Sequence, residues 1–261
     1  MCASFLTKEN LHAFLEEKFN QYNRLSFIDS DPICIPHQFQ RKEDIEISGF
    51  LTATIAWGNR RSIITNATSL MNLMDNAPFE FVTQHTTKDL KKFDDFVHRT
   101  FNGIDCTFFI RSLKNIYTKH NGLELAFSKG IKPNDVDVKN AIIHFREQFL
   151  RQSHQKRSEK HISDPAKNSS SKRLCMYLRL MVRKDMKGVD LGIWKSIDPS
   201  LLCLPLDVHT GNVSRKLGLL KRKQDDWKAV EEITGVLRQL DPKDPVKYDL
   251  ALFGLGVSRE L

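Results

Sequence analysis

The fold is predicted first from one stretch of the sequence, Leu204-Pro-Leu-Asp-Val-His-Thr-Gly-Asn-Val-Ser-Arg-Lys-Leu-Gly-Leu219. Asp207 stands where an N-cap accepts hydrogen bonds from the first turn of a helix. Gly218 follows Leu217 in the position of a helix-ending residue. The stretch therefore predicts a short helix with one carboxylate at its start, where backbone amides and the helix dipole keep that carboxylate ionised.

A second helix is predicted upstream, in Ser169-Ser-Ser-Lys-Arg-Leu-Cys-Met-Tyr-Leu-Arg-Leu-Met-Val-Arg183. Lys172 falls in its first turn, behind three serines, any of which could cap the helix. By helical spacing Lys172, Arg179 and Arg183 share one face, and a basic stripe of this kind is usually solvated. A lysine at a helix start feels the positive end of the dipole, which favours the neutral amine that nucleophilic attack requires.

Basic residues are concentrated in one part of the chain. The whole sequence has 40 Lys and Arg against 32 Asp and Glu, for a formal charge of +8. Residues 151–187 contain eleven of the basic residues and three of the acidic ones, so this segment accounts for the whole excess. A localised field of this kind attracts polyanions, nucleic acid first, although charge runs are often ordinary solvated surface.

Length and composition predict a soluble cytoplasmic protein. A chain of 261 residues, 40% of them hydrophobic, can form one large core or two modest lobes. No run approaches the roughly 18 apolar residues that span a bilayer, and the first residues lack the regions of a secretion signal. The five cysteines are dispersed, which favours reduced thiols over a disulfide framework.

No metal or cofactor is expected. The absence of closely spaced cysteines excludes an iron–sulfur cluster or zinc knuckle built from such a group. The nine histidines show no His-x-x-x-His pattern, and no clustered carboxylate pattern suits metal-dependent hydrolysis.

Helical periodicity dominates the sequence, and no convincing strand alternation appears. Residues 42–57 are apolar almost all round, as in a central buried helix, whereas residues 151–171 are polar enough for an exposed loop. The expected architecture is all-α, either one unit or two helical lobes, 1–40 plus 150–261 and 41–149, around a cleft. Further helices are predicted at 7–22, 60–74, 89–97, 106–120, 123–129, 138–150, 225–240 and 246–253.

Most of the chain resembles a conserved bacterial family that carries a domain of unknown function. The sequence marks of that family match residues 36–47, 172–185, 188–194 and 245–256. This likeness is specific, but it implies no activity.

The central third to half of the chain resembles a second family, the helix-hairpin-helix DNA glycosylases. Residues 206–219 are similar to the segment V-D-T-H-V-x-R-V-x-x-R-L-G-L, whose aspartate is catalytic in that family. Lys172 falls where bifunctional members carry their Schiff-base lysine, at the start of the second hairpin helix. Residues 47–61 resemble the helix F-x-x-L-x-x-x-I-L-S-Q-Q-T, which closes over the flipped base. The interval from lysine to aspartate is most like that of the archaeal 8-oxoguanine glycosylases.

This resemblance implies a base-excision repair enzyme that acts on damaged duplex DNA, such as an oxidised purine, as a glycosylase and abasic-site lyase. Lys172 is then the nucleophile at the sugar C1′ and Asp207 the carboxylate that stabilises its developing charge. The implied base pocket contains Trp57, Asn59 and His209, although Trp57 can equally be a core indole and Asp207 only a helix cap. The implied DNA contacts are Lys167, Ser169, Ser170, Ser171, Arg173, Arg179, Arg183, Lys184 and Arg215.

The chain departs from the glycosylase pattern at one turn. Family hairpins carry G-V-G or G-I-G, whose amides bind a DNA phosphate, whereas residues 166–171 read Ala-Lys-Asn-Ser-Ser-Ser. Serine hydroxyls and a helix start can also bind phosphate. Two alternatives therefore stay open: a nucleic-acid-binding protein on the same scaffold without catalysis, and a protein whose basic loop contacts an acidic protein partner.

Overall fold

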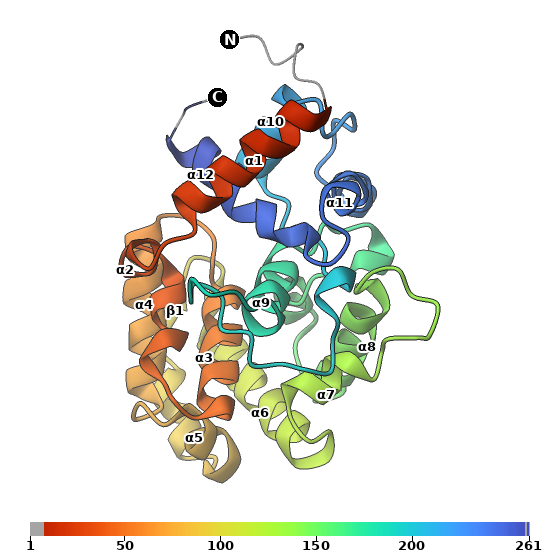
Figure 1. The fold of residues 1–261 in the computed structure, drawn as a ribbon. Coiled ribbons are helices and arrows are strands. Elements are labelled where there is room, and N and C mark those ends of the chain that lie inside the picture. The colour runs from red at the N-terminus through yellow and green to blue at the C-terminus, as the bar shows by residue number, and fades with distance from the viewer. Residues whose placement is uncertain (1–7, 259, 261) are drawn as a thin grey trace. The chain divides into compact units, whose positions relative to one another are not determined.

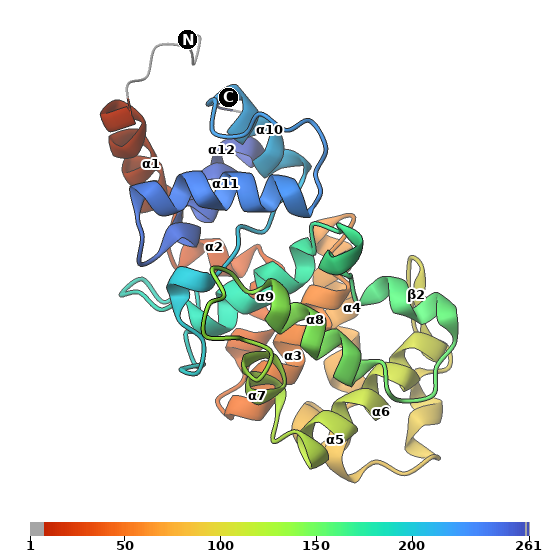
Figure 2. The ribbon, with the colours of Figure 1, turned by 90° about the vertical axis from the view of Figure 1, so that its right-hand side faces the viewer.

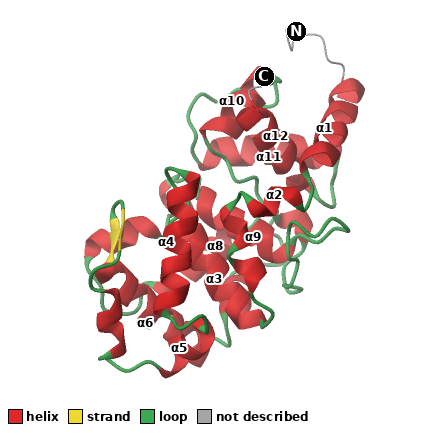
Figure 3. Ribbon diagram, turned by 90° about the vertical axis from the view of Figure 1, so that its left-hand side faces the viewer, coloured by secondary structure: helices red, strands yellow, loops and turns green. Residues whose placement is uncertain are grey.

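The computed structural model describes residues 8–258 and residue 260, and this part of the chain is mostly helical, as predicted. Figure 3 shows the helices and the one hairpin, in which Val97 pairs with Asn102 and His98 with Phe101. The α-helices are α1 Lys8–Tyr22, α2 Ser26–Asp29, α3 Lys42–Thr54, α4 Arg60–Leu73, α5 Pro78–Gln84, α6 Gly103–Lys119, α7 Leu123–Ser128, α8 Lys139–Phe149, α9 Lys172–Val182, α10 Val208–Lys216, α11 Trp227–Leu240 and α12 Tyr248–Ser258.

Short 3-10 helices and the two strands complete the secondary structure. The strands are β1 Val97–His98 and β2 Phe101–Asn102. The 3-10 helices are η2 Pro32–Cys34, η3 Pro36–Gln38, η4 Asp89–Phe93, η5 Lys156–His161, η6 Pro165–Lys167, η7 Pro199–Leu201 and η8 Pro245–Lys247.

The chain divides into two compact units, and each is built from separate stretches of sequence. Unit 1 contains residues 1–27, 135–138 and 164–261, and unit 2 contains residues 28–134 and 139–163. The sequence had suggested lobe boundaries near residues 40 and 150, so the observed second boundary lies inside the polar segment that was expected to be a single loop.

Unit 1 is organised around its C-terminal helices. α12 packs along α1 and against α10, and the red α1 and blue α12 lie side by side in Figure 1. Figure 2 shows α10, α11 and α12 gathered in this part of the chain. The loop after α9 returns along it, because the amides of Leu191 and Gly192 donate to the Leu180 carbonyl. Trp194 from this loop meets Tyr177 edge to face, with ring centroids 5.4 Å apart.

Unit 2 has an aromatic core. α3 is buried along nearly its whole length, as its all-round apolar sequence predicted. Phe50 from α3 contacts Phe109 of α6 and Phe145 and Phe149 of α8, with ring centroids 5.4 to 6.0 Å apart. Aromatic rings bury large areas and add edge-to-face attraction, so this cluster holds three helices together.

Two local predictions in unit 2 were wrong. Residues 89–97 form η4 and strand β1 instead of an α-helix, and the next helix, α6, begins directly after the hairpin at a capping box of Asn102 and Asp105. Residues 151–163 are not a plain exposed loop, since they contain η5. Ser158 of η5 is buried and donates to Asp105 at 2.6 Å. A buried carboxylate elsewhere in the chain thus orders a segment that has few apolar residues of its own.

Candidate functional site

Lys172 and Asp207 form an ion pair in unit 1. Lys172 Nζ lies 2.9 Å from Asp207 Oδ2, and the two side chains are 32% and 15% exposed. Lys172 is the first residue of α9, and Asp207 is the residue before α10. Two helix starts therefore place an amine and a carboxylate in contact, at a position that solvent still reaches.

The Asp207 carboxylate is held ionised by its neighbours. One of its oxygens accepts a hydrogen bond from the Thr210 amide at 2.8 Å, as the sequence predicted for an N-cap. Burial alone raises the pKa of Asp207, but the ammonium of Lys172 and the Thr210 amide outweigh burial and lower the pKa below its usual value. The carboxylate is therefore charged at neutral pH and able to face a developing cation.

The turn before α9 contains left-handed backbone at two residues that are not glycine. Asn168 has a φ of +65° and Ser171 a φ of +49°, in the region that glycine adopts most readily. The Asn168 side chain donates to Asp226 at 2.9 Å, and the Asn168 carbonyl accepts from the Trp227 amide, which ties the turn to the start of α11. Asn168 and Ser171, whose side chains are short and polar, thus adopt left-handed backbone that glycine would adopt most readily.

Two of the three predicted phosphate-binding serines, Ser169 and Ser171, bond to each other within this turn. Ser171 is the N-cap residue of α9, but its hydroxyl donates to the Ser169 carbonyl instead of capping the helix. The Ser169 hydroxyl accepts from the Ser171 amide at 3.3 Å. Ser171 is buried, and Ser169 and Ser170 are half-buried. The expected serine cap is therefore wrong, and the Ser171 hydroxyl faces the protein.

Two basic residues of this α9 face, Arg179 and Arg183, are buried, contrary to the expectation of a solvated face, whereas Lys172 stays partly exposed. Arg179 pairs with Asp249 and, at 3.2 Å, with Asp190. Arg183 lies 2.9 Å from Asp190 and from Asp244 and also contacts Asp185. Both guanidinium groups are neutralised inside unit 1 and do not reach solvent. The predicted DNA contacts of Arg179 and Arg183 are corrected accordingly.

The other predicted cations differ in their accessibility. Lys167 and Lys184 are exposed, as a phosphate contact requires. Arg173 is half-buried, and desolvation lowers its pKa to about 10, which leaves it charged at neutral pH. Arg215 donates to Asp225 at 2.6 Å, so its charge is largely matched within the protein.

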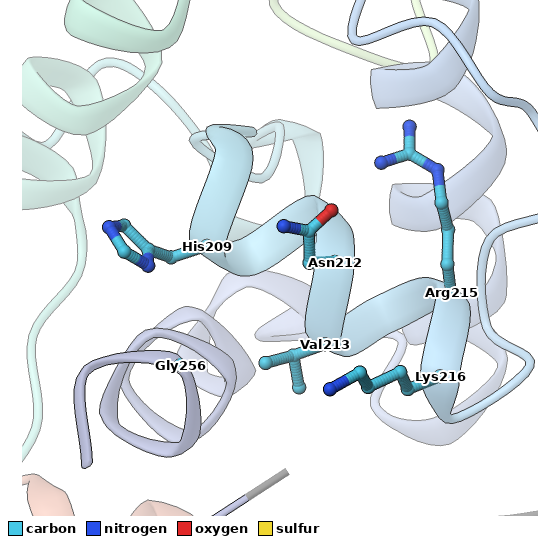
Figure 4. A pocket seen from close by; sticks show the side chains of 6 residues that line it. All are labelled: His209, Asn212, Val213, Arg215, Lys216 and Gly256. Carbon is cyan, nitrogen blue, oxygen red and sulfur yellow. The ribbon is translucent and has the colours of Figure 1, made fainter. Parts of the chain in front are cut away.

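A hollow of about 350 Å³ lies along α10 (Figure 4). Lys216 turns back beneath Val213 on the side of Gly256 of α12, whereas the guanidinium of Arg215 points away. His209 and Arg215, both predicted site residues, line this hollow and lie on α10, the helix that Asp207 caps. It is lined by His209, Asn212, Val213, Arg215, Lys216 and Gly256.

The other two predicted base-pocket residues belong to unit 2. Trp57 is half-buried, stacks on His161 at 5.8 Å between ring centroids, and meets His98 edge to face at 5.1 Å. Asn59 is exposed and caps α4 by accepting from the Ser62 amide at 3.3 Å. Both residues have a structural role within their own unit, and their role in base binding stays a prediction.

Sequence reasoning missed the four carboxylates that pair with Arg179 and Arg183, namely Asp185, Asp190, Asp244 and Asp249. Asp190 follows Gly-Val and precedes Leu, and Asp249 stands between Tyr and Leu-Ala-Leu, so both interrupt apolar runs. Acidic residues in such runs are buried only when they are paired. Together with the basic residues of α9, these acidic residues within apolar runs are the sequence signal that could have predicted the buried ion pairs.

The chain belongs to the family of proteins of unknown function designated DUF2400, whose model matches residues 31–258. This confirms the prediction of a family that carries a domain of unknown function over most of the chain. Comparisons with curated proteins and with solved structures found no match. Within residues 8–258 and 260, no helix is both long and apolar enough to cross a membrane. The same residues contain no group of three His, Cys, Asp or Glu arranged to hold a metal ion.

Proposed function

We propose that the protein is a DNA glycosylase with abasic-site lyase activity, which removes a damaged base such as an oxidised purine. The observation that carries this proposal is the 2.9 Å contact between Lys172 Nζ and Asp207 Oδ2. The resemblance to helix-hairpin-helix glycosylases supplies the same two residues as nucleophile and electrostatic partner. Residues that lie 35 positions apart in the sequence are in contact only if the fold brings them together. The contact between these two predicted residues therefore supports the proposal.

The chemistry needs a neutral amine beside an ionised carboxylate. The ammonium of Lys172 first releases a proton to water. Its nitrogen then bonds to C1′ while the bond from C1′ to the base breaks, and the base leaves with the electron pair and takes up a proton. Opening of the C1′–O4′ bond, with a proton passing from nitrogen to that oxygen, leaves an imine. Asp207 stabilises the positive charge on the sugar throughout.

Substrate binding requires that the target nucleotide leave the base stack, which costs a few kcal/mol and costs least for a damaged base. Phosphates that flank the extruded sugar need cations or amides near Lys172 and Asp207. The hollow along α10, with His209, Asn212 and Lys216, supplies such groups on the helix that Asp207 caps. The left-handed turn before α9 is the second candidate phosphate contact.

The test is borohydride trapping on duplex DNA that contains 8-oxoguanine, with an undamaged duplex beside it. Borohydride reduces the imine to an amine and so links protein to DNA covalently. Wild-type protein is expected to be trapped on the damaged duplex. Lys172→Gln is expected to abolish trapping, and Lys187→Gln, an exposed lysine of the same basic segment, is the matched control. Trapping that survives Lys172→Gln refutes the assignment of the nucleophile.

A second candidate function is nucleic-acid binding without catalysis. The same ion pair favours it, because an ammonium held by a carboxylate is stable and unreactive until it loses a proton. Equal affinity for damaged and undamaged duplexes, without base release, would support this function in place of the enzyme.

A further inference from the structure

The turn that follows α9 presents an apolar side chain to solvent. Met186 is 100% exposed, the largest exposed fraction of any large apolar side chain within residues 8–258. Leu25, which is 62% exposed, lies against the same turn, because a Cβ added at Gly188 would be 3.6 Å from Leu25 Cδ2. Single exposed apolar side chains are common on protein surfaces, so the meaning of this exposure depends on how the turn is held.

Asp185 holds the turn in one conformation. One of its carboxylate oxygens accepts hydrogen bonds from the amides two and three residues further on, at 2.8 and 3.3 Å. The other oxygen accepts from Asn23 Nδ2 at 2.6 Å and lies 2.8 Å from Arg183 Nη1. Asn23 and Arg183 are buried, so the turn is tied to the interior of unit 1. Met186 is therefore held out from the protein on an ordered turn, which spares a partner the cost of ordering it.

Cations lie beside the apolar residues in the sequence. Lys184 is exposed, and its Cβ is fixed against the returning loop, since a Cβ added at Gly192 would approach it to 2.4 Å. Arg24, the residue before Leu25, is exposed as well. Arg183 matches the charge of Asp185, the acidic residue of the turn. Lys184, Met186, Arg24 and Leu25, called the Met186 surface below, thus combine an apolar tip with positive charge.

Two kinds of partner combine negative charge with a place for an apolar side chain, namely an anionic bilayer and a nucleic-acid duplex. A bilayer requires more apolar surface than Met186 and Leu25 offer, because even one fatty acyl chain anchors a protein only marginally. A duplex requires a single side chain, because methionine or leucine can enter a base step while cations beside it contact the phosphates. We propose that the Met186 surface binds duplex nucleic acid, with Met186 at a base step and Lys184 and Arg24 on the phosphates.

This contact is separate from the candidate site. Lys172 is the first of the 11 residues of α9, and Met186 comes after the last, so the helix alone separates them by about 15 Å along its axis. The Met186 surface therefore serves binding and not the chemistry at Lys172. The choice of partner rests on the proposed function, but the contact itself is measured without base release.

The direct test is oxidation of Met186 by hydrogen peroxide, with and without a saturating undamaged DNA duplex. Peroxide transfers one oxygen atom to the thioether sulfur, which becomes a sulfoxide, and is itself reduced to water. Mass spectrometry follows the rate, with free methionine in the same solution as the reference. The duplex is expected to slow oxidation of Met186 several-fold and to leave the reference unchanged. An unchanged rate, or protection by anionic vesicles and not by the duplex, overturns the proposal.

The second test is duplex affinity, measured by fluorescence anisotropy over a salt series. Met186→Ser is expected to weaken binding about tenfold at an unchanged slope of log affinity against log salt, because an apolar contact releases no counterions. Met186→Leu is expected to retain the affinity, and Lys184→Gln is expected to reduce the slope by about 1. Val136→Ser, at an exposed apolar residue elsewhere in unit 1, is the matched control and is expected to bind as wild type. An unweakened Met186→Ser, or an equal loss in Val136→Ser, overturns the proposal.

The two tests separate this inference from the proposed enzyme. Protection of Met186 without borohydride trapping refutes the glycosylase and leaves the Met186 contact standing. Trapping on damaged DNA with an unprotected Met186 refutes the contact and leaves the glycosylase standing. Absence of duplex binding by the wild-type protein overturns the contact.

Discussion

Asp207 serves two purposes at one position. One carboxylate oxygen caps α10 through the Thr210 amide, and the other faces the Lys172 amine. The cap fixes the side chain in one orientation before any substrate arrives, which spares the cost of ordering it during a reaction. A residue that appears in sequence as an ordinary helix cap is therefore also well placed for chemistry.

Substitutions at Asp207 can separate its role as the N-cap of α10 from its role beside the Lys172 amine. Asp207→Asn keeps an N-cap acceptor, because asparagine caps helices as well as aspartate does, whereas Asp207→Ala removes it. The alanine variant is expected to lose about 1 kcal/mol more free energy of unfolding than the asparagine variant. Urea unfolding at pH 7 measures the difference. Both variants are expected to lose trapping activity, and equal stability of the two would contradict the capping role.

The pH dependence of stability follows from the Asp249 carboxyl. Its pKa is raised to about 6 in the folded protein, so the folded state binds a proton more tightly than the unfolded chain between about pH 4 and 6. The stability that Asp249 contributes is present below pH 4 and is lost as the pH rises through 6. The free energy of unfolding of wild type, relative to Asp249→Asn, is expected to fall by about 2 to 3 kcal/mol over this range. Denaturation at several pH values tests it, and a difference that rises with pH would contradict it.

At the scale of elements, α9 turns its charged side inward. Its basic side chains are neutralised by carboxylates from the loop after α9 and from the start of α12. Removing one partner of a buried ion pair leaves an uncompensated charge, which is far more costly than losing an exposed pair. The positions of the loop after α9 and of the start of α12 therefore both depend on ion pairs with one face of α9.

Arg179→Ala is expected to lower the free energy of unfolding by about 3 to 5 kcal/mol at pH 7, because Asp249 and Asp190 lose their partner. The loss is expected to be smaller at pH 5, where Asp249 takes up a proton. Lys184→Ala, two residues beyond α9 and exposed, is the control and is expected to change stability by less than about 0.5 kcal/mol. Thermal or urea unfolding measures both. A stable Arg179→Ala protein with weakened DNA affinity would restore the original phosphate-contact role.

Sequence patterns predicted most helices of the described residues: α3 from its all-round apolar sequence, α4, α9 and α11 from an apolar face, and α10 from the signals at its two ends. The N-cap at Asp207 was predicted from the position of this aspartate at the start of the helical stretch. The burial of the basic face of α9 was not predicted, because its sequence pattern is the same whether water surrounds the face or carboxylates distant in the sequence pair with it. The short segment η5 was missed because its order comes from a partner distant in the sequence, Asp105.

At the scale of the whole molecule, the basic field of residues 151–187 is smaller than the sequence suggests. Its residues are divided between unit 1 and unit 2, and Arg157, Arg179 and Arg183 are paired with carboxylates. Exposed lysines such as Lys167 and Lys184 remain for an external polyanion. Lys216, from outside that segment, adds a cation at the hollow along α10.

Lys216→Gln is expected to weaken duplex DNA binding uniformly across sequences and to reduce the slope of log affinity against log salt by about 1. Fluorescence anisotropy between about 50 and 200 mM salt measures this slope. Lys228→Gln, an exposed lysine of α11 away from the hollow, is the control and is expected to keep the wild-type slope. Identical slopes in all three proteins would exclude the hollow as a phosphate contact.

The packing of α1 against α12 has a consequence for how the chain is made. α1 ends at Tyr22 and α12 begins at Tyr248, so about 225 residues must be synthesised before the first helix meets its partner. At typical elongation rates this takes about 10 to 45 s on the ribosome. During that interval the apolar side of the nascent α1 stays uncovered, while most of unit 2 has already emerged and can fold. The growing polypeptide is thus expected to leave this side of α1 exposed until α12 has been synthesised.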